Sequence, residues 1–236
     1  MSAQIYSGTS GWAYAGWKPD FYPAKLPSKK FLAHYATRLN SVEVNYTFRR
    51  FPTENLLRGW IDATGPDFQF AMKANQSITH IKRLHDAQET TARFTDSLAP
   101  LHQTDKLGPV LFQLPPYLKC DLERLREFLA ILPKWLRATL EFRHDSWFNE
   151  DVYAALRKSG AALCWAETED IQTPEVQTAD FHYLRIRKPV SDLRATEKKV
   201  RRLLENGAVY LYFKHEDTPE GALNAESLLR NLDKAR

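Results

Sequence analysis

The chain has 236 residues, of which 43% are hydrophobic and 12% aromatic, enough for one large core. No apolar run approaches the roughly 20 residues that span a bilayer, and the opening residues do not resemble a secretory signal. We therefore expect a cytoplasmic protein with no membrane partner. Cys120 and Cys164 are the two cysteines. Their wide spacing matches neither a disulfide framework nor a zinc site.

Eight short apolar segments predict β-strands, most of them followed by a segment with helical periodicity. A long loop separates the first strand from the first helix, and only a short helix fits between the sixth and seventh strands. The strands are predicted to begin near Ile5, Val42, Phe68, Val110, Thr139, Ala162, Phe181 and Val209. The longer helices are predicted over residues 28–39, 53–65, 86–101, 121–132, 149–159, 192–207 and 220–236.

Cap residues support these helices, with Ser28 and Thr53 placed as N-caps, Asp86 and Glu89 in capping-box spacing, and Gly207 at a C-terminus. Strands that alternate with helices pair in parallel. Eight such units in about 250 residues are typical of an α/β fold of the (β/α)8 type, a TIM barrel. We expect one barrel domain over residues 1–236. A doubly wound sheet is the alternative, but no GxGxxG follows the first strand.

Polar side chains recur at the carboxyl ends of the predicted strands, where TIM barrels place their active sites. Alternate residues of a strand share a face, and the opposite face here carries Val, Leu or Phe, so the polar face is predicted to point into the barrel. The candidate site consists of polar residues at these strand ends, together with Trp12 of the first loop and His144, which follows a strand end. Those assigned to catalysis are Glu43, Glu141 and Lys73, and those assigned to substrate binding are Asn45, Gln113, Arg143, His144, Trp12, Arg185, Arg187 and Lys214.

Each candidate also has a structural interpretation. The charged residues could form an ion-pair network that fills the barrel, although Val, Ile and Leu fill most barrels. A buried Gln113 could satisfy backbone groups, and His80 and His144 could be held by neighbouring loop groups. Trp12 and the other aromatic residues of the first loop could stack on a ligand or form a small core of the loop itself.

Several motifs resemble those of the YecE-like proteins, an uncharacterised family also called domain of unknown function 72. The resemblance covers nearly the whole chain and implies a TIM barrel, but no activity. The chain differs at Arg187 and Lys188, where the family pattern has His-Gly, and at Lys214 and His215, where it has two Asn. The motifs that carry the resemblance are Gly8-Thr9-Ser10-Gly11-Trp12, Phe21-Tyr22-Pro23, Val42-Glu43-Val44-Asn45, the LFQLPP segment at residues 111–116 and Glu141-Phe142-Arg143-His144.

Three functions are compatible with these features. The first is a metal-independent enzyme of the hydrolase or lyase class that acts on a small phosphate- or carboxylate-bearing substrate, with Glu43 or Glu141 as general acid or base. A glycosidase would use these two carboxylates about 5 to 9 Å apart, but Gln113 occupies the position where a further acid is usual. The second is a nucleic-acid-binding or nucleic-acid-processing barrel. The third is a non-catalytic sensor of a small molecule.

The expected ligand is anionic, because the net charge is +4 and the pI is near 9.0. Arg185, Arg187 and Lys214 place cations over strands seven and eight, where barrels often bind phosphate. The basic run at residues 198–202 reads as a solvated helix face, so nucleic acid is a less favoured partner. We expect no metal and no cofactor, since the histidines and carboxylates do not converge in a ligand pattern.

Overall fold

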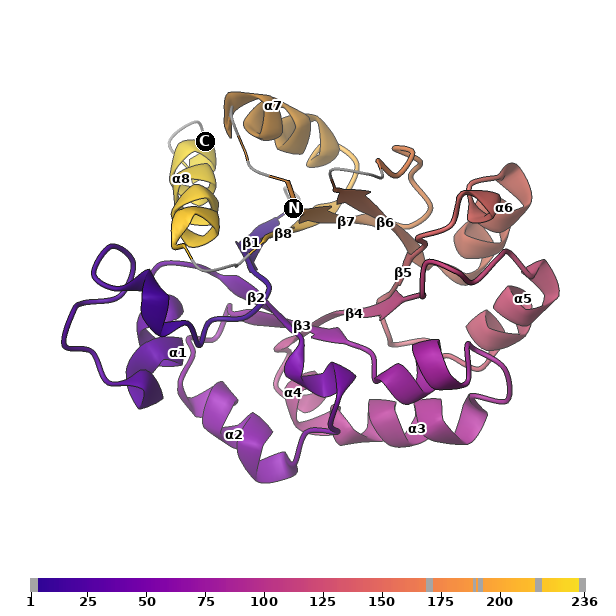
Figure 1. The fold of residues 1–236 in the computed structure, drawn as a ribbon, viewed down its shortest axis with the longest axis horizontal. Helices are drawn as coiled ribbons and strands as arrows, with labels where there is room; N and C mark the ends of the chain where they lie inside the picture. The colour runs from indigo at the N-terminus through magenta and orange to yellow at the C-terminus, as the bar shows by residue number, and fades with distance from the viewer. Residues whose placement is uncertain (1–3, 169–171, 189, 191–192, 215–217, 234–236) are drawn as a thin grey trace.

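Eight parallel strands form a single sheet that curves into a barrel, and helices cover its outside (Figure 1). The computed structural model describes residues 4–168, 172–188, 190, 193–214 and 218–233. The hydrogen-bonded order is β1-β8-β7-β6-β5-β4-β3-β2, as expected for a (β/α)8 barrel. Among the described residues, no helix has the length and apolar character needed to cross a membrane.

The strands confirm the predicted fold, since seven of the eight begin within one residue of the predicted position. β4 begins three residues earlier than predicted. Their bounds are Ile5–Thr9 (β1), Ser41–Val44 (β2), Gln69–Lys73 (β3), Leu107–Gln113 (β4), Ala138–Glu141 (β5), Ala162–Glu167 (β6), Phe181–Ile186 (β7) and Ala208–Phe213 (β8).

The helices mostly follow the prediction, and the Thr53 side chain caps α2 by accepting a hydrogen bond from Leu56 N. Two predicted caps are wrong: Ser28 is itself the first residue of a 3-10 turn, and Asp86 adopts a positive φ of 46° before the helix begins. The bounds are Phe31–Tyr35 (α1), Glu54–Asp62 (α2), Gln88–Ser97 (α3), Ala99–Gln103 (α4), Leu122–Ala130 (α5), Glu150–Ser159 (α6), Leu193–Leu203 (α7) and Glu220–Asp233 (α8).

The expected short helix between β6 and β7 is absent from the described residues of that connection. The segment is held instead by its contacts with β6. Thr173 N donates to Ala166 O, and Trp165 Nε1 donates to Val176 O. Pro174 has no N–H to offer, which favours this extended path over a helical turn.

The seam between β1 and β2 is closed largely by side chains. Asn40 accepts a hydrogen bond from Ser7 N at 2.9 Å and donates to Ile5 O at 2.8 Å. Tyr35 Oη accepts from Thr9 N at 2.8 Å and donates to Ser41 O at 3.0 Å. These side-chain hydrogen bonds stand where backbone bonds would join two paired strands, so Asn40 and Tyr35 satisfy the backbone groups at the edges of β1 and β2.

The core has two parts, one between the sheet and the helices and one inside the barrel. Val42, Val44, Leu140 and Phe142 point outward and pack in the larger core, as strand parity predicted. The lower interior is filled by tyrosines and small residues, including Tyr183, Tyr210, Tyr212, Ala71, Ala162 and Cys164. The polar ends of the strands lie above this layer and form the mouth of the barrel.

Candidate functional site

The centre of the site is Arg185, a buried guanidinium held between two carboxylates. Its Nη1 donates to Glu141 Oε2 at 2.5 Å, and its Nη2 donates to Glu43 Oε1 at 2.8 Å. Burial alone would lower the pKa of Arg185, but Glu141 and Glu43 together raise it above its usual value. Both ends of the guanidinium are therefore occupied by protein groups.

Glu43 is fully buried and accepts hydrogen bonds from four side chains. Ser10 Oγ donates at 2.6 Å and Arg187 Nη2 at 2.9 Å, both to the Oε1 atom that Arg185 contacts. Tyr183 Oη donates to Oε2 at 2.8 Å. This many donors compensate the loss of hydration of a buried carboxylate. Glu43 is thereby fixed at the floor of the mouth.

Glu141 is the start of a chain of contacts that runs across three strands to Lys73. Glu141 Oε1 accepts from Gln113 Nε2 at 2.8 Å, and Gln113 Oε1 accepts from Lys73 Nζ at 2.8 Å. Parallel pairing places Gln113 beside Glu141, because β4 and β5 are in register at these residues. The predicted catalytic residues Glu43, Glu141 and Lys73 thus belong to one network, linked through Arg185 and Gln113.

Lys73 is a half-buried amine in cationic surroundings. Desolvation, followed by the charge of Arg185, lowers the pKa of Lys73 to about 8, although Glu43 and Glu141 oppose the shift. Its Nζ lies 4.3 Å from the centre of the Phe48 ring. A sizeable fraction of such an amine is neutral near pH 8, and a neutral amine can accept a proton or attack a carbonyl carbon.

The two loop histidines have local partners. His144 Nδ1 accepts from Ser146 N at 3.2 Å and caps a 3-10 turn, so this side chain is satisfied by its own loop. His80 Nδ1 lies 2.8 Å from Thr79 Oγ1, and the ring stands edge-on to Phe48. Burial, together with the charge of Lys73, lowers the pKa of His80, so this imidazole is neutral at pH 7.

The remaining basic candidates lie beyond the strand ends. Arg143 is exposed, and within the described part of the chain it has no hydrogen bond or ion pair. Arg143 nevertheless acts on Lys73, whose pKa it helps to lower. Arg187 is partly buried on Glu43, and Lys214 is exposed after β8. His215 lies outside the described residues. Arg185 and Arg187 therefore hold carboxylates, whereas Arg143 and Lys214 lie nearer the surface.

Asn45 and Trp12 lie at the edges of the site. Asn45 Oδ1 is a buried acceptor without a hydrogen-bond partner among the described residues. Trp12 is half-buried and stands edge-on to Trp60, with ring centres 5.2 Å apart. Trp17 and its neighbours in the same loop are buried against one another, so most aromatic residues of this loop form its own core.

Sequence reasoning did not assign a site role to Ser10, Tyr183 or Cys164. Tyr183 has the same strand parity as Arg185 two residues later, a signal that could have identified it. Ser10 belongs to the first-strand motif but follows the strand itself. Cys164 Sγ lies 3.9 Å from Glu141 Oε2, and burial, followed by the charge of Glu141, raises the pKa of this thiol well above its usual value. The thiol is therefore protonated.

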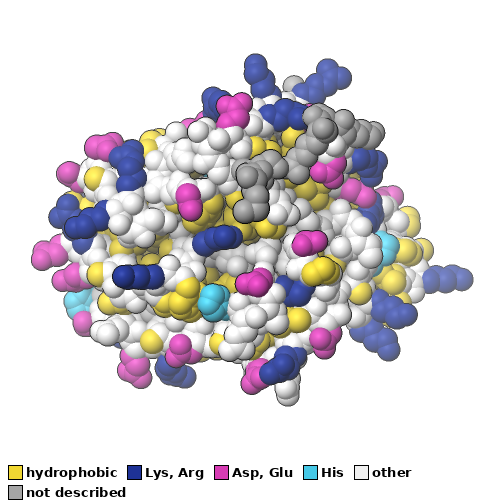
Figure 2. Space-filling model, turned by 180° about the vertical axis from the view of Figure 1, so that it is seen from behind, with side chains coloured by type: hydrophobic (Ala, Val, Ile, Leu, Met, Phe, Trp, Pro, Cys, Tyr) yellow, Lys and Arg dark blue, Asp and Glu magenta, His cyan; other side chains and the backbone are white. Residues whose placement is uncertain are grey.

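The face of the barrel opposite to the one seen in Figure 1 does not form one basic surface. On the face seen in Figure 2, basic and acidic side chains are interspersed over the whole outline. Among the described residues, no group of three or more His, Cys, Asp or Glu side chains is placed to hold a metal ion. Charged groups gather in the network at the mouth and in a second ion-pair cluster of Glu167, Glu175, Lys199 and Arg202.

Comparisons with known proteins give relatives without an assigned activity. The chain is 32% identical over 160 residues to UPF0759 protein YunF of Bacillus subtilis, covering 63% of this chain and 54% of that protein. It is 28% identical over 145 residues to UPF0759 protein YecE of Escherichia coli strain K12, covering 61% of this chain and 50% of that protein. The chain thus spans about half the length of the curated relatives it matches.

Solved structures resemble the barrel over almost its whole length. A DUF72 family protein of Thermotoga maritima has a TM-score of 0.84 and 26% identity, covering 98% of this chain and 99% of that one. An AP endonuclease of family 2 from Brucella melitensis has a TM-score of 0.56 and 9% identity, covering 99% of each chain, and at this identity shows the fold alone. The family model described as protein of unknown function DUF72 matches residues 6–236, which confirms the resemblance seen in the motifs, and the chain therefore belongs to the DUF72 family.

Proposed function

We propose that this protein is a metal-independent enzyme that acts on a small anionic substrate at the mouth of the barrel, with Lys73 as the reactive group. The observation that carries the proposal is the difference between Lys73 and the carboxylates. Glu43 and Glu141 both bind Arg185, whereas Lys73 Nζ has a neutral hydrogen-bond acceptor, Gln113 Oε1. The amine is the group whose protonation state is poised for proton transfer or nucleophilic attack.

The carboxylates support the site in this proposal instead of acting as free bases. A carboxylate that accepts several charge-assisted hydrogen bonds is stabilised in its ionised form and is a weak proton acceptor. For the same reason its oxygens are poor ligands for a metal ion. Glu141 and Gln113 position Lys73 through their hydrogen bonds, and Arg185 keeps the two acids apart.

We place the anionic part of the substrate over the ends of β3, β4 and β5. Over β7, the two Nη atoms of Arg185 donate to Glu141 and Glu43, its Nε is buried without a partner among the described residues, and Arg187 already donates to Glu43. Arg143 follows β5, is exposed, and lies close enough to Lys73 to lower its pKa. A phosphate or carboxylate between these two cations would gain charge-assisted hydrogen bonds. Asn45 Oδ1, an unpartnered acceptor among the described residues, could receive a hydroxyl donor of the same ligand.

The test uses glyoxylate, a small anion that carries an aldehyde, together with cyanoborohydride. A neutral amine condenses with the aldehyde to an imine and water, and hydride then reduces the imine to a stable secondary amine. We expect peptide mass spectrometry to find Lys73 labelled ahead of the exposed Lys29, with a rate that rises through pH 8. Inorganic phosphate should slow the labelling of Lys73 and leave that of Lys29 unchanged.

Two variants separate the role of the amine from that of the charge. Lys73→Arg keeps a cation but removes the amine, so it should lose the label and keep the phosphate-dependent rise in melting temperature. Arg143→Gln should reduce that rise and slow the labelling of Lys73. Labelling of Lys73 no faster than that of Lys29, or a rate insensitive to Arg143, would contradict the proposal.

A further inference from the structure

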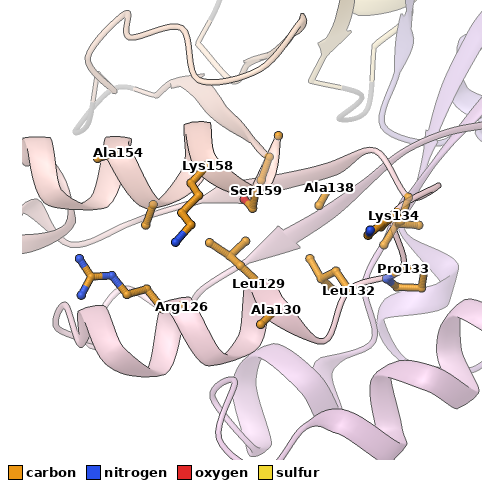
Figure 3. Close-up of a pocket in the computed structure, with 14 residues that line it drawn as sticks. Arg126, Leu129, Ala130, Leu132, Pro133, Lys134, Ala138, Ala154, Lys158 and Ser159 are labelled. Carbon is orange, nitrogen blue, oxygen red and sulfur yellow. The ribbon is translucent and has the colours of Figure 1, made fainter.

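A second hollow lies far from the mouth, between α5 and α6 near the amino-terminal ends of β5 and β6 (Figure 3). Its volume is about 690 Å³, within the range of small-molecule sites. Leu129 of α5 and Leu136 before β5 contribute apolar walls. Ala154 and Ala155 leave space on the α6 side, because their side chains are short.

The charged residues that line this groove are all basic. Arg126 and Lys158 lie on the facing helices, and Lys134 lies at the other end beside Pro133 (Figure 3). Within the part of the chain that the structure describes, none of the three has an ion pair. Arg124 and Arg157 on the same two helices do pair, with Asp121 and Glu150 respectively. The cations at the groove are thus left available, unlike their neighbours.

We propose that the α5–α6 groove binds a single-chain amphiphile with an anionic head group, such as a medium-chain fatty acid. The hydrocarbon chain would cover the leucine and alanine walls, whose burial is favourable roughly in proportion to the apolar area removed from water. The carboxylate would lie between Arg126 and Lys158. This site is independent of the chemistry at the mouth of the barrel.

The charge pattern selects this ligand over other occupants. A second copy of the chain would bring its own three cations to the seam if the same face paired with itself, and like charges disfavour such contact. A flat anionic membrane would contact exposed cations but would not fill a groove between two helices. A monomeric amphiphile satisfies both the apolar walls and the cations.

The experiment is calorimetric titration of the whole protein with octanoate, decanoate and 1-decanol, all below the concentrations at which they aggregate. We expect saturable binding of one decanoate per chain. Affinity should rise by up to about fourfold for each methylene that becomes fully buried. Decanol should bind at least about fivefold more weakly than decanoate, because it lacks the charge that pairs with the cations.

Variants assign the binding to the groove. Ala154→Leu fills the space from an exposed helical position and should weaken decanoate binding about tenfold or more without unfolding the chain. Arg126→Gln and Lys158→Gln should each weaken it about three- to tenfold. Lys29→Gln removes an exposed positive charge elsewhere and should leave the affinity unchanged.

Three results would overturn the proposal: no saturable binding of decanoate, equal binding of decanoate and decanol, or unchanged affinity in Ala154→Leu. Sedimentation of the ligand-free protein tests the alternative of a second copy, because a dimer that Ala154→Leu dissociates would assign the groove to self-association. Binding to anionic phosphatidylglycerol vesicles without binding to monomeric decanoate would assign the cations to a membrane surface and would also overturn it.

Discussion

Replacing Arg185 with methionine tests whether the network at the mouth is a buried ion-pair system. Methionine has an apolar chain of similar length but cannot donate hydrogen bonds. The substitution leaves Glu141 without its ion-pair partner and Glu43 with only Arg187 as a cation. Glu43 is 0% and Glu141 3% exposed, so water does not replace the missing guanidinium.

The expected loss of unfolding free energy is large. Removing one partner of a buried ion pair costs about 3 to 5 kcal/mol because it leaves a charge uncompensated. Stabilities of about 5 to 15 kcal/mol are usual for single domains, so the variant should be close to unfolding. Urea unfolding followed by circular dichroism at pH 7 measures this loss.

A matched control is Arg58→Met, which breaks an exposed pair with Glu54 on α2. Its two side chains are 65% and 62% exposed, so a loss below about 0.5 kcal/mol is expected. Adding Glu141→Gln to Arg185→Met should restore part of the stability, because it removes the orphaned charge. A loss below about 1 kcal/mol for Arg185→Met, or no recovery in the double variant, would refute the buried network.

Three further substitutions test other parts of the structure by urea unfolding. Lys73→Met should raise stability at pH 7 by about 1 kcal/mol, because the folded protein desolvates the ammonium and lowers its pKa from 10.5 to about 8. This gain is full below pH 8 and should fade between pH 8 and 10.5, where the folded protein has released a proton that the unfolded chain still binds; a gain that does not fade would argue against the desolvated amine. Tyr35→Phe should cost about 1 to 3 kcal/mol, because it leaves the buried N–H of Thr9 without an acceptor, and a neutral result would show that water closes the seam instead. Gly8→Ala should prevent stable folding, since the added methyl would lie 1.9 Å from a carbonyl oxygen of β2, whereas Gly59→Ala on α2 meets nothing within 4 Å and should be neutral or stabilising.

The sequence contained enough information to predict the barrel and the charged members of the network, but not Ser10 or Tyr183. Period-two alternation placed Glu43, Glu141 and Arg185 on the inner face, and the structure confirms that all three point there. The local sequence pattern was enough to identify these site residues. Each lies at the end of a strand, which a local pattern can locate, and closure of the barrel then brings the strand ends together. The predicted caps at Ser28 and Asp86 were wrong because the backbone conformation of a loop depends on contacts with residues that are distant in the sequence.

Partners within the network could not be predicted from the sequence. Arg143 follows Glu141 by two residues, just past the end of β5, yet Glu141 pairs with Arg185 from two strands away. Strand tilt and side-chain length decide which cation reaches which acid, and neither is visible in a linear pattern. The sequence did not predict the α5–α6 groove, because the alanines that leave space for it look like ordinary helix residues.

The arrangement of charges connects the network to the proposed ligand. Glu43 and Glu141 carry two negative charges, and Arg185 and Arg187 bind them with two positive ones. This part of the site is therefore electrically balanced. Lys73 and Arg143 stand above it without an ion-pair partner among the described residues, since Lys73 donates to an amide oxygen and Arg143 has no hydrogen bond there. In the proposed function, a neutral floor beneath these two cations would attract an anion to the mouth. An anion held there would raise the pKa of Lys73 back toward that of an ordinary lysine, so product release would be coupled to loss of a proton from the amine.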